Sequence, residues 1–386
     1  MKRVSNFWVL GAIFVTALVL RPPVAQIGPI LEVIQNALGL DSSQTAVLTA
    51  IPVLCFGFGA FASPALVRKF GLNQTMIYLL AVLVLTIAIR PYAGFIGLVL
   101  GTTLAGLAMA VANVLLPSVV RSRFPKHVVI LTSCYTTLLA VSASFAAAFS
   151  YPSALGLGWQ LSLAIWALPT LLALLLSFSL LSGDQSVSDS ENEDPSGDTK
   201  LILRSPMAWA IMALFGIQSL GFYALLAWLP SLAIDSGMNP TDAGSLLSLM
   251  TVIGVPLGLI LSSNFGRFKS LSLVGTLISI VTLTGMCLLL LQFWVPAAIV
   301  IGVGQASSFP LSLSLISTRA ANQRITTMLS SVSQGIGYLI AAAGTFLFGW
   351  VATVTGNWEV SVLGLIGLTL IQAAAAWFAG KPKLIK

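Results

Sequence analysis

Long apolar stretches separated by short polar gaps occupy almost the whole chain. Each stretch is close to the ~20 apolar residues that a helix needs to cross a bilayer. None alternates apolar and polar residues as a membrane strand does. The pattern therefore predicts an all-α membrane protein with twelve transmembrane helices. These helices are expected near residues 7–30, 44–66, 74–90, 95–119, 129–151, 159–181, 206–231, 243–265, 271–291, 295–317, 325–351 and 360–379.

Composition supports this prediction and excludes a soluble protein with a wet surface. The chain is 57% hydrophobic and only 8% charged, whereas a soluble domain has about 25% charged residues. Its net charge of +7 would suggest nucleic-acid binding in a soluble protein. Here the basic residues are dispersed over short loops, so we expect a lipid bilayer and no nucleic acid as partner.

The basic residues also predict the orientation of the chain in the membrane. Of 18 Lys and Arg residues, 16 lie at the two termini or in every second gap between apolar stretches. Cytoplasmic loops of membrane proteins collect Lys and Arg. Both termini and segment 182–200 are therefore expected on the cytoplasmic side. Two arginines depart from the pattern, because Arg21 lies inside the first apolar stretch and Arg90 closes the third.

Segment 182–200 divides the apolar stretches into two sets of six. It carries six acidic residues and several Ser and Gly, a composition that cannot bury a core. We predict an N-terminal six-helix bundle over 1–181, an acidic cytoplasmic linker over 182–204 and a C-terminal six-helix bundle over 205–386. A regulatory site at one of the linker serines is the alternative to a simple connection.

The two halves show traces of an internal repeat. Pro29 and Asp41 are 12 residues apart, and so are Pro230 and Asp242. The runs GLAMAVANVLLP (106–117) and GVGQASSFP (302–310) both contain Gly and close at Pro. Two parallel six-helix repeats with a cavity at their interface near the middle of the membrane are typical of transporters.

Several runs resemble the cyanate permease and 2-nitroimidazole transporter family of the major facilitator superfamily. They are LRPPVAQIGPIL (20–31), VLTAIPVLCFGFGA (47–60), NVLLPSVVRSRFP (113–125), GWQLSLAIWALP (158–169), SPMAWAIMALFGIQSLGFYALLAWLPSLAIDSGM (205–238) and SVSQGIGYLIAAAGTFLFG (331–349). The resemblance extends almost end to end, and it implies the major facilitator fold in a bacterial inner membrane. The superfamily motif between spans two and three is degenerate, since Ser63 and Pro64 lie where an Asp is expected.

Arg21 is the strongest candidate for solute contact. A charged side chain deep in a bilayer costs at least ~2.5–3.5 kcal/mol unless it meets a partner or water. The sequence places no Asp or Glu in the interior of a span, so an anionic or electron-rich solute would supply the missing charge. Pro22 and Pro23 remove two helix hydrogen bonds, and interrupted helices occur where they line a cavity. The alternative is a side chain that extends to water, toward Glu32.

Further polar and aromatic residues in the spans are candidate solute contacts, because polar groups of spanning helices point inward. Hydrogen bonding between helices is the alternative for each of them. One of them, Trp228, could stack on a planar solute or lie in the aromatic belt at the membrane surface. The set comprises Gln26, Asn113, Tyr135, Gln218, Tyr223, Trp228, Gln305, Gln334 and Tyr338.

Motifs for enzymatic chemistry are missing from the sequence. There is no phosphate loop, no HExxH and no GxSxG, so we expect neither an enzyme nor a cofactor. Cys55, Cys134 and Cys287 are dispersed in apolar spans, which predicts neither a metal site nor a disulfide framework.

The expected function is secondary-active or facilitative transport of a small anionic or planar weakly acidic solute by alternating access, by a protein expected to be monomeric. The resemblance implies cyanate first and a nitroimidazole-like compound second. A multidrug exporter of the major facilitator type is the main alternative. A membrane sensor that does not transport is the alternative from another class.

The predicted orientation can be tested by cysteine labelling in intact cells. In a cysteine-free background, Ser190→Cys should resist a membrane-impermeant thiol reagent, because position 190 lies in the cytoplasmic linker. Asn239→Cys should be labelled, because it lies in an external gap. Labelling of position 190 from outside in sealed cells would contradict the assignment.

Overall fold

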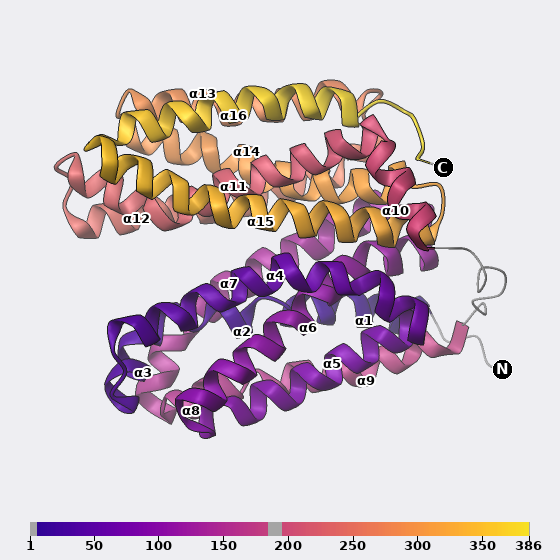
Figure 1. Cartoon of the computed structure of the whole chain (residues 1–386), viewed down its shortest axis with the longest axis horizontal. Helices are drawn as coiled ribbons and strands as arrows, with labels where there is room; N and C mark the ends of the chain where they lie inside the picture. Colours follow the sequence, from indigo (N-terminus) through magenta and orange to yellow (C-terminus); the bar gives the residue numbers. More distant parts are fainter. Residues whose placement is uncertain (1–5, 184–194, 386) are drawn as a thin grey trace. The chain divides into compact units, whose positions relative to one another are not determined.

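The computed structural model describes residues 6–183 and 195–385, and these residues are almost entirely helical (Figure 1). Most of the predicted acidic linker, residues 184–194, lies outside the described residues, and so does the side chain of Glu32. The last ten residues of the predicted linker form helix α10 (Pro195–Arg204).

The first half of the chain contains nine α-helices and three short 3-10 helices among its described residues. They are α1 (Asn6–Val19), α2 (Pro22–Ala25), η1 (Gly28–Ile30), α3 (Leu31–Leu38), α4 (Ser42–Phe70), α5 (Leu72–Ile89), η2 (Arg90–Tyr92), α6 (Gly94–Arg123), α7 (Val128–Leu157), α8 (Trp159–Ala164), α9 (Ala167–Ser177) and η3 (Phe178–Gly183).

After α10, the second half has fewer and longer helices. They are α11 (Pro206–Asp235), α12 (Pro240–Ser263), η4 (Phe265–Arg267), α13 (Leu271–Leu290), α14 (Trp294–Arg319), α15 (Gln323–Thr355) and α16 (Trp358–Ala379).

These helices confirm the predicted fold class. Ten segments of the described chain are long and apolar enough to cross a membrane, and they coincide with ten of the predicted spans. The remaining two predictions, the second and the eighth, fall on α4 with 29 residues and α12 with 24 residues. The first span, Asn6–Ile30, is not one helix, because α1 ends at Val19 and α2 begins at Pro22. The interruption predicted from Pro22 and Pro23 is thus confirmed.

The chain divides into two compact units. Unit 1 comprises residues 1–123 and 135–197, and unit 2 comprises residues 124–134 and 198–386. The first seven residues of α7 therefore group with unit 2. Each unit consists of helices that run side by side along a common direction (Figure 1).

Helix packing repeats between the two units, as the internal sequence repeat suggested. In unit 1, α4 packs on α6, α5 packs on α6 and α9, and α1 packs on α9. In unit 2, α12 packs on α14, α13 packs on α14 and α16, and α11 packs on α16. When the spans of each half are counted in order, these are the same four pairs.

Small residues allow one of these pairs to come very close in both units. A Cβ atom on Gly106 of α6 would lie 2.8 Å from Cβ of Cys55 in α4. A Cβ atom on Gly302 of α14 would lie 2.3 Å from the carbonyl oxygen of Met250 in α12. Close backbone approach through small residues is a main source of helix association in membranes, where lipid removes the hydrophobic driving force.

Replacing Gly302 should therefore destabilise the protein. Gly302→Ala forces α12 and α14 apart, and overpacking of this kind costs about 1–3 kcal/mol. We expect a lower midpoint of thermal unfolding in detergent. Gly364→Ala is the matched control, because nothing lies within 4 Å of a Cβ atom built on that helical glycine. Its midpoint should be unchanged or higher, and equal midpoints for the two variants would contradict the packing account.

Candidate functional site

Arg21 lies in the interruption of the first span. Its carbonyl oxygen accepts hydrogen bonds from the amides of Val24 and Ala25, at 3.1 and 3.0 Å. Proline occupies the first two positions of α2, where backbone N–H groups have no partner within the helix. The partly buried guanidinium lies over the ring of Phe56 in α4, with Cζ 5.3 Å from the ring centroid. The fold thus brings the Arg21 cation onto the aromatic face of Phe56, and a cation–π contact of this kind is favourable.

Arg90 begins η2 and was not among the candidate residues chosen from the sequence. Its side chain is 1% exposed. Nη2 donates to the carbonyl oxygen of Pro23 at 2.8 Å, and Nη1 donates to Oγ1 of Thr102 in α6 at 3.3 Å. The only signal in the sequence was a second basic residue within an apolar stretch.

Gln26 is buried at the end of α2 and connects it to α8. Its Nε2 donates to the carbonyl oxygen of Leu163 at 3.5 Å. The other two candidates in unit 1 are also buried. Asn113 donates to the carbonyl oxygen of Met109, one turn earlier in α6, at 3.0 Å, and Tyr135 lies in α7 with 1% of its surface exposed.

In unit 2 the structure brings two candidate tyrosines together. The rings of Tyr223 in α11 and Tyr338 in α15 lie 6.4 Å apart in a T-shaped arrangement. Phe215 of α11 lies edge-on to Tyr338 at 5.3 Å. Such pairs have a preferred geometry and present a defined aromatic surface.

The glutamine candidates of unit 2 lie on α11, α14 and α15. Gln218 donates to the carbonyl oxygen of Phe215 at 3.2 Å and to Oγ of Ser219 at 2.6 Å. Gln334 donates to Oγ of Ser330 at 2.7 Å. A Cβ atom built on Gly221 of α11 would lie 3.0 Å from Nε2 of Gln305, so the Gln305 amide lies against α11.

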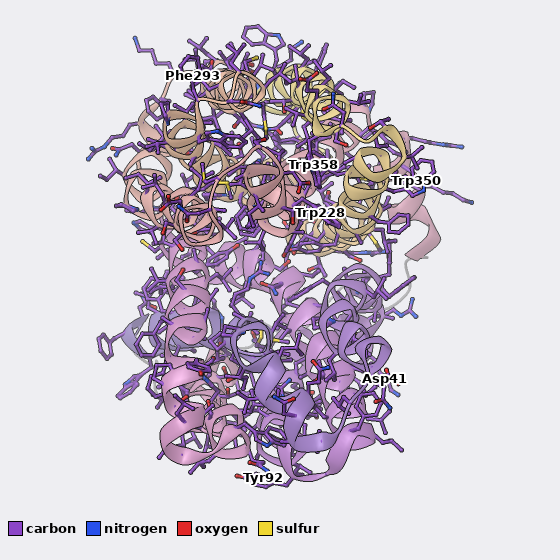
Figure 2. All side chains as sticks on the ribbon, turned by 90° about the vertical axis from the view of Figure 1, so that its left-hand side faces the viewer. Asp41, Tyr92, Trp228, Phe293, Trp350 and Trp358 are labelled. Atoms are coloured by element: carbon purple, nitrogen blue, oxygen red, sulfur yellow. The ribbon has the colours of Figure 1, made fainter. Side chains whose placement is uncertain are left out.

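Trp228 takes part in helix packing. Its Nε1 donates to the carbonyl oxygen of Thr345 in α15 at 3.0 Å. Its ring lies 5.8 Å from that of Trp358, and Figure 2 shows these two side chains close together within unit 2. By contrast, Trp350 and Phe293 point outward (Figure 2) and are more than half exposed.

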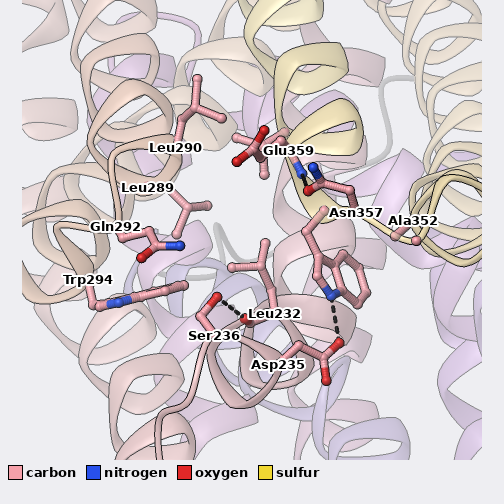
Figure 3. Close-up of a pocket in the computed structure, with 13 residues that line it drawn as sticks. Leu232, Asp235, Ser236, Leu289, Leu290, Gln292, Trp294, Ala352, Asn357 and Glu359 are labelled. Carbon is pink, nitrogen blue, oxygen red and sulfur yellow. Dashed lines mark hydrogen bonds between the residues drawn. The ribbon is translucent and has the colours of Figure 1, made fainter.

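A cavity of about 570 Å³ opens at one end of unit 2, between the ends of five helices (Figure 3). Two carboxylates, Asp235 and Glu359, lie in its wall together with Trp294 and Trp358. Asp235 accepts a hydrogen bond from Nε1 of Trp358 at 2.7 Å. None of the candidate residues from the sequence lines this cavity. Its negative charge makes it unsuited to an anionic solute.

The described part of the chain contains no group of three or more His, Cys, Asp or Glu side chains arranged to hold a metal ion. Cys55, Cys134 and Cys287 are all free thiols, and they lie on different helices. The candidate residues from the sequence are cationic, amide and aromatic groups.

Comparison with known proteins shows the family to which the chain belongs. Residues 7–334 match the Major Facilitator Superfamily. The chain is 31% identical to the uncharacterized transporter YycB of Bacillus subtilis (strain 168), over 100% of this chain and 96% of that protein. It is 30% identical to the 2-nitroimidazole transporter of Escherichia coli (strain K12), over 98% and 96% of the two chains.

A further relative is the cyanate transport protein CynX of Escherichia coli (strain K12), which is 28% identical over 91% of this chain and 93% of that protein. The fold is similar to the crystal structure of the transporter FucP in the outward conformation. The TM-score is 0.77 at 15% identity, with 97% of this chain and 99% of that chain covered. These similarities define a multi-pass membrane transporter. The chain belongs to the major facilitator superfamily, in the family of the cyanate and 2-nitroimidazole transporters.

Two buried glutamines, Gln305 and Gln372, can be compared to test whether the candidate Gln305 stabilises the fold. Oε1 of Gln305 is buried without a hydrogen-bond partner among the described residues, which costs about 1–3 kcal/mol. Gln372 of α16 instead donates to Ser279 and Ser308, both at 3.4 Å. Gln305→Leu should therefore raise the midpoint of thermal unfolding, and Gln372→Leu should lower it. A fall in both midpoints would show that Gln305 serves the fold like any other buried amide.

Proposed function

We propose that the protein moves a small anionic or planar, weakly acidic solute across a bacterial inner membrane by alternating access, as a facilitative or secondary-active transporter. Cyanate is the first candidate and a nitroimidazole-like compound is the second. The observation that carries this proposal is the position of Arg21, which lies in the interrupted first span with its guanidinium over the face of Phe56.

The chemistry of the guanidinium fits such a solute. Arginine stays charged and presents a planar fork that binds oxygen-bearing groups through two parallel hydrogen bonds. A negative charge beside it would be favoured, because partial burial of the side chain reduces the screening of the attraction by water. A planar solute bonded to the fork would also lie near the aromatic face of Phe56. A cationic solute would be repelled at this position.

Two relatives support the same chemical class. One carries the name of a cyanate transport protein and another that of a 2-nitroimidazole transporter. Cyanate is a linear anion, and a nitro group presents two oxygens in one plane. Both therefore offer an electron-rich acceptor with oxygen atoms that Arg21 would bind.

The polar residues of the two units provide further candidate contacts. In unit 1 these are Gln26, Asn113 and Tyr135. In unit 2 they are the aromatic pair Tyr223 and Tyr338, which would provide apolar surface and hydroxyl groups, and the glutamines Gln218, Gln305 and Gln334. For Trp228, whose indole N–H is engaged by Thr345, the candidate contact is the ring face.

The distribution of basic residues supports a proposed orientation of the chain. We propose that both termini lie in the cytoplasm and that the protein works as a monomer. The distribution of 16 of its 18 basic residues over the termini and alternate loops supports this orientation, because cytoplasmic loops are enriched in Lys and Arg.

Variants of Arg21 test the proposed function. Arg21→Lys keeps the charge but loses the planar fork, so it should retain part of the affinity for cyanate. Arg21→Gln should lose about 1.5–3 kcal/mol of binding free energy. This loss raises the dissociation constant roughly 10- to 150-fold. Binding to purified protein and flux into proteoliposomes are the measurements, with 2-nitroimidazole as the second solute.

The control is Arg204→Gln, which removes an exposed arginine from α10. It should leave binding and flux unchanged. Equal affinity of wild type and a folded Arg21→Gln protein would contradict solute contact at Arg21. The absence of flux of both solutes through the wild type would contradict the proposed solute class.

A further inference from the structure

Arg90 lies at the interruption of the first span, but its guanidinium is already bonded to other parts of the protein. We propose that Arg90 is a positioning residue, which fixes the interrupted span in the conformation that presents Arg21 to the solute. This inference rests on the proposed function of Arg21. The side chain of Arg90 reaches the proposed solute-binding region by donating to the backbone carbonyl of Pro23, which lies two residues from Arg21.

The carbonyl oxygen of Pro23 needs a donor because the helix ends too early to provide one. In a continuous helix this oxygen would accept from the amide of Ile27. That amide instead donates to the carbonyl oxygen of Val24 at 3.2 Å, since α2 ends at Ala25. An unsatisfied carbonyl inside a membrane costs several kcal/mol. Nη2 of Arg90 satisfies it at 2.8 Å.

Arg90 can fix this carbonyl in space because the guanidinium is itself anchored. Its other terminal nitrogen donates to Oγ1 of Thr102 in α6. η2 and α6 approach closely at this point, as the position of Gly101 in α6 shows. A Cβ atom built on Gly101 would lie 2.4 Å from Cβ of Arg90. The guanidinium therefore joins three segments of unit 1, namely η2, α6 and α2.

Gln26 provides a second attachment for the same short segment. Its amide donates to the carbonyl oxygen of Leu163, which lies in the last turn of α8, where carbonyls lack partners within the helix. The α8 helix packs against η2, which begins at Arg90. The short α2 helix is thus held on both sides, by Arg90 at Pro23 and by Gln26 at its end, and Arg21 directly precedes it.

Direct binding of solute by Arg90 is the competing role. Arg90 is 1% exposed, and both terminal nitrogens of its fork already donate to protein oxygens. Nε has no partner among the described residues, but it is buried with the rest of the side chain. A solute could reach this guanidinium only after the helices around it moved apart. The positioning role therefore uses the contacts that the structure shows, and the binding role would need a different arrangement of unit 1.

Hydrogen exchange of the backbone amides tests the positioning role without any solute. Arg90→Met keeps an unbranched apolar side chain but removes both donors. It should speed the exchange of the amides of residues 24–27 by about tenfold, the effect of losing roughly 1.4 kcal/mol of local stability. Exchange in α13 of unit 2 should not change. Arg90→Lys keeps one donor that can reach Pro23, so it should restore slow exchange in part.

Binding and transport of cyanate form the second arm. Arg90→Met should raise KM by about tenfold, while the maximal flux per folded molecule falls much less. A purely structural role would reduce the amount of folded protein and leave KM unchanged in the remainder. Thr102→Val removes only the weaker anchor and should give a smaller change of the same kind.

The possible outcomes separate this inference from the proposed function. Unchanged exchange at residues 24–27 in Arg90→Met, with weaker solute binding, would assign Arg90 to direct binding and overturn the positioning role. Faster exchange with unchanged KM would show that the attachment exists but does not serve Arg21, which also overturns it. If Arg90→Met fails to fold, Arg90→Lys and Thr102→Val decide, and unchanged exchange in both would overturn the inference.

Failure of the proposed function has a different signature. The wild-type protein would then bind neither cyanate nor 2-nitroimidazole, whatever the exchange data show. Faster exchange at residues 24–27 in Arg90→Met would still support the attachment of α2 by Arg90.

Discussion

A backbone carbonyl surrounded by apolar helices must find a hydrogen-bond donor, and the interrupted first span depends on meeting this requirement. Two consecutive prolines end α1 early, and the short α2 helix that follows cannot satisfy the carbonyl of Pro23. Arg90 provides the donor from the end of the third span. The interruption, which brings the Arg21 guanidinium beside Phe56, is thus stabilised by a second arginine.

Close packing gives this arrangement a stable framework. The second and fourth spans of each half approach through small residues, with Gly106 in one unit and Gly302 in the other. The same four helix pairs recur in both units. The two units nevertheless differ in their buried polar groups, because unit 1 carries Arg21 and Arg90 while unit 2 carries the Tyr223 and Tyr338 pair and the candidate glutamines. Unit 2 also has a cavity at its end whose wall carries the carboxylates of Asp235 and Glu359.

Features that depend on local residue patterns were predicted from the sequence, and features that depend on distant contacts were not. The helices and the interruption at Pro22 follow from apolar length and from proline chemistry. The role of Arg90 does not, since its partner is a carbonyl 67 residues away. The hydrogen bond of Trp228 likewise joins residues 117 apart, so a packing tryptophan and a solute-stacking one have the same signature in the sequence. α10 forms where the acidic composition predicted only a linker.

We expect an anionic solute to bind directly at Arg21. Solid-state nuclear magnetic resonance can measure this contact through the dipolar coupling between ¹³C-labelled cyanate and ¹⁵N-labelled arginine side chains in reconstituted protein. The account predicts a strong coupling in the wild type and in Arg204→Lys. It predicts loss of the coupling in Arg21→Lys, which retains the charge and part of the binding but carries no labelled guanidinium at that position. A coupling that persists unchanged in Arg21→Lys would place the solute at another arginine and contradict the account.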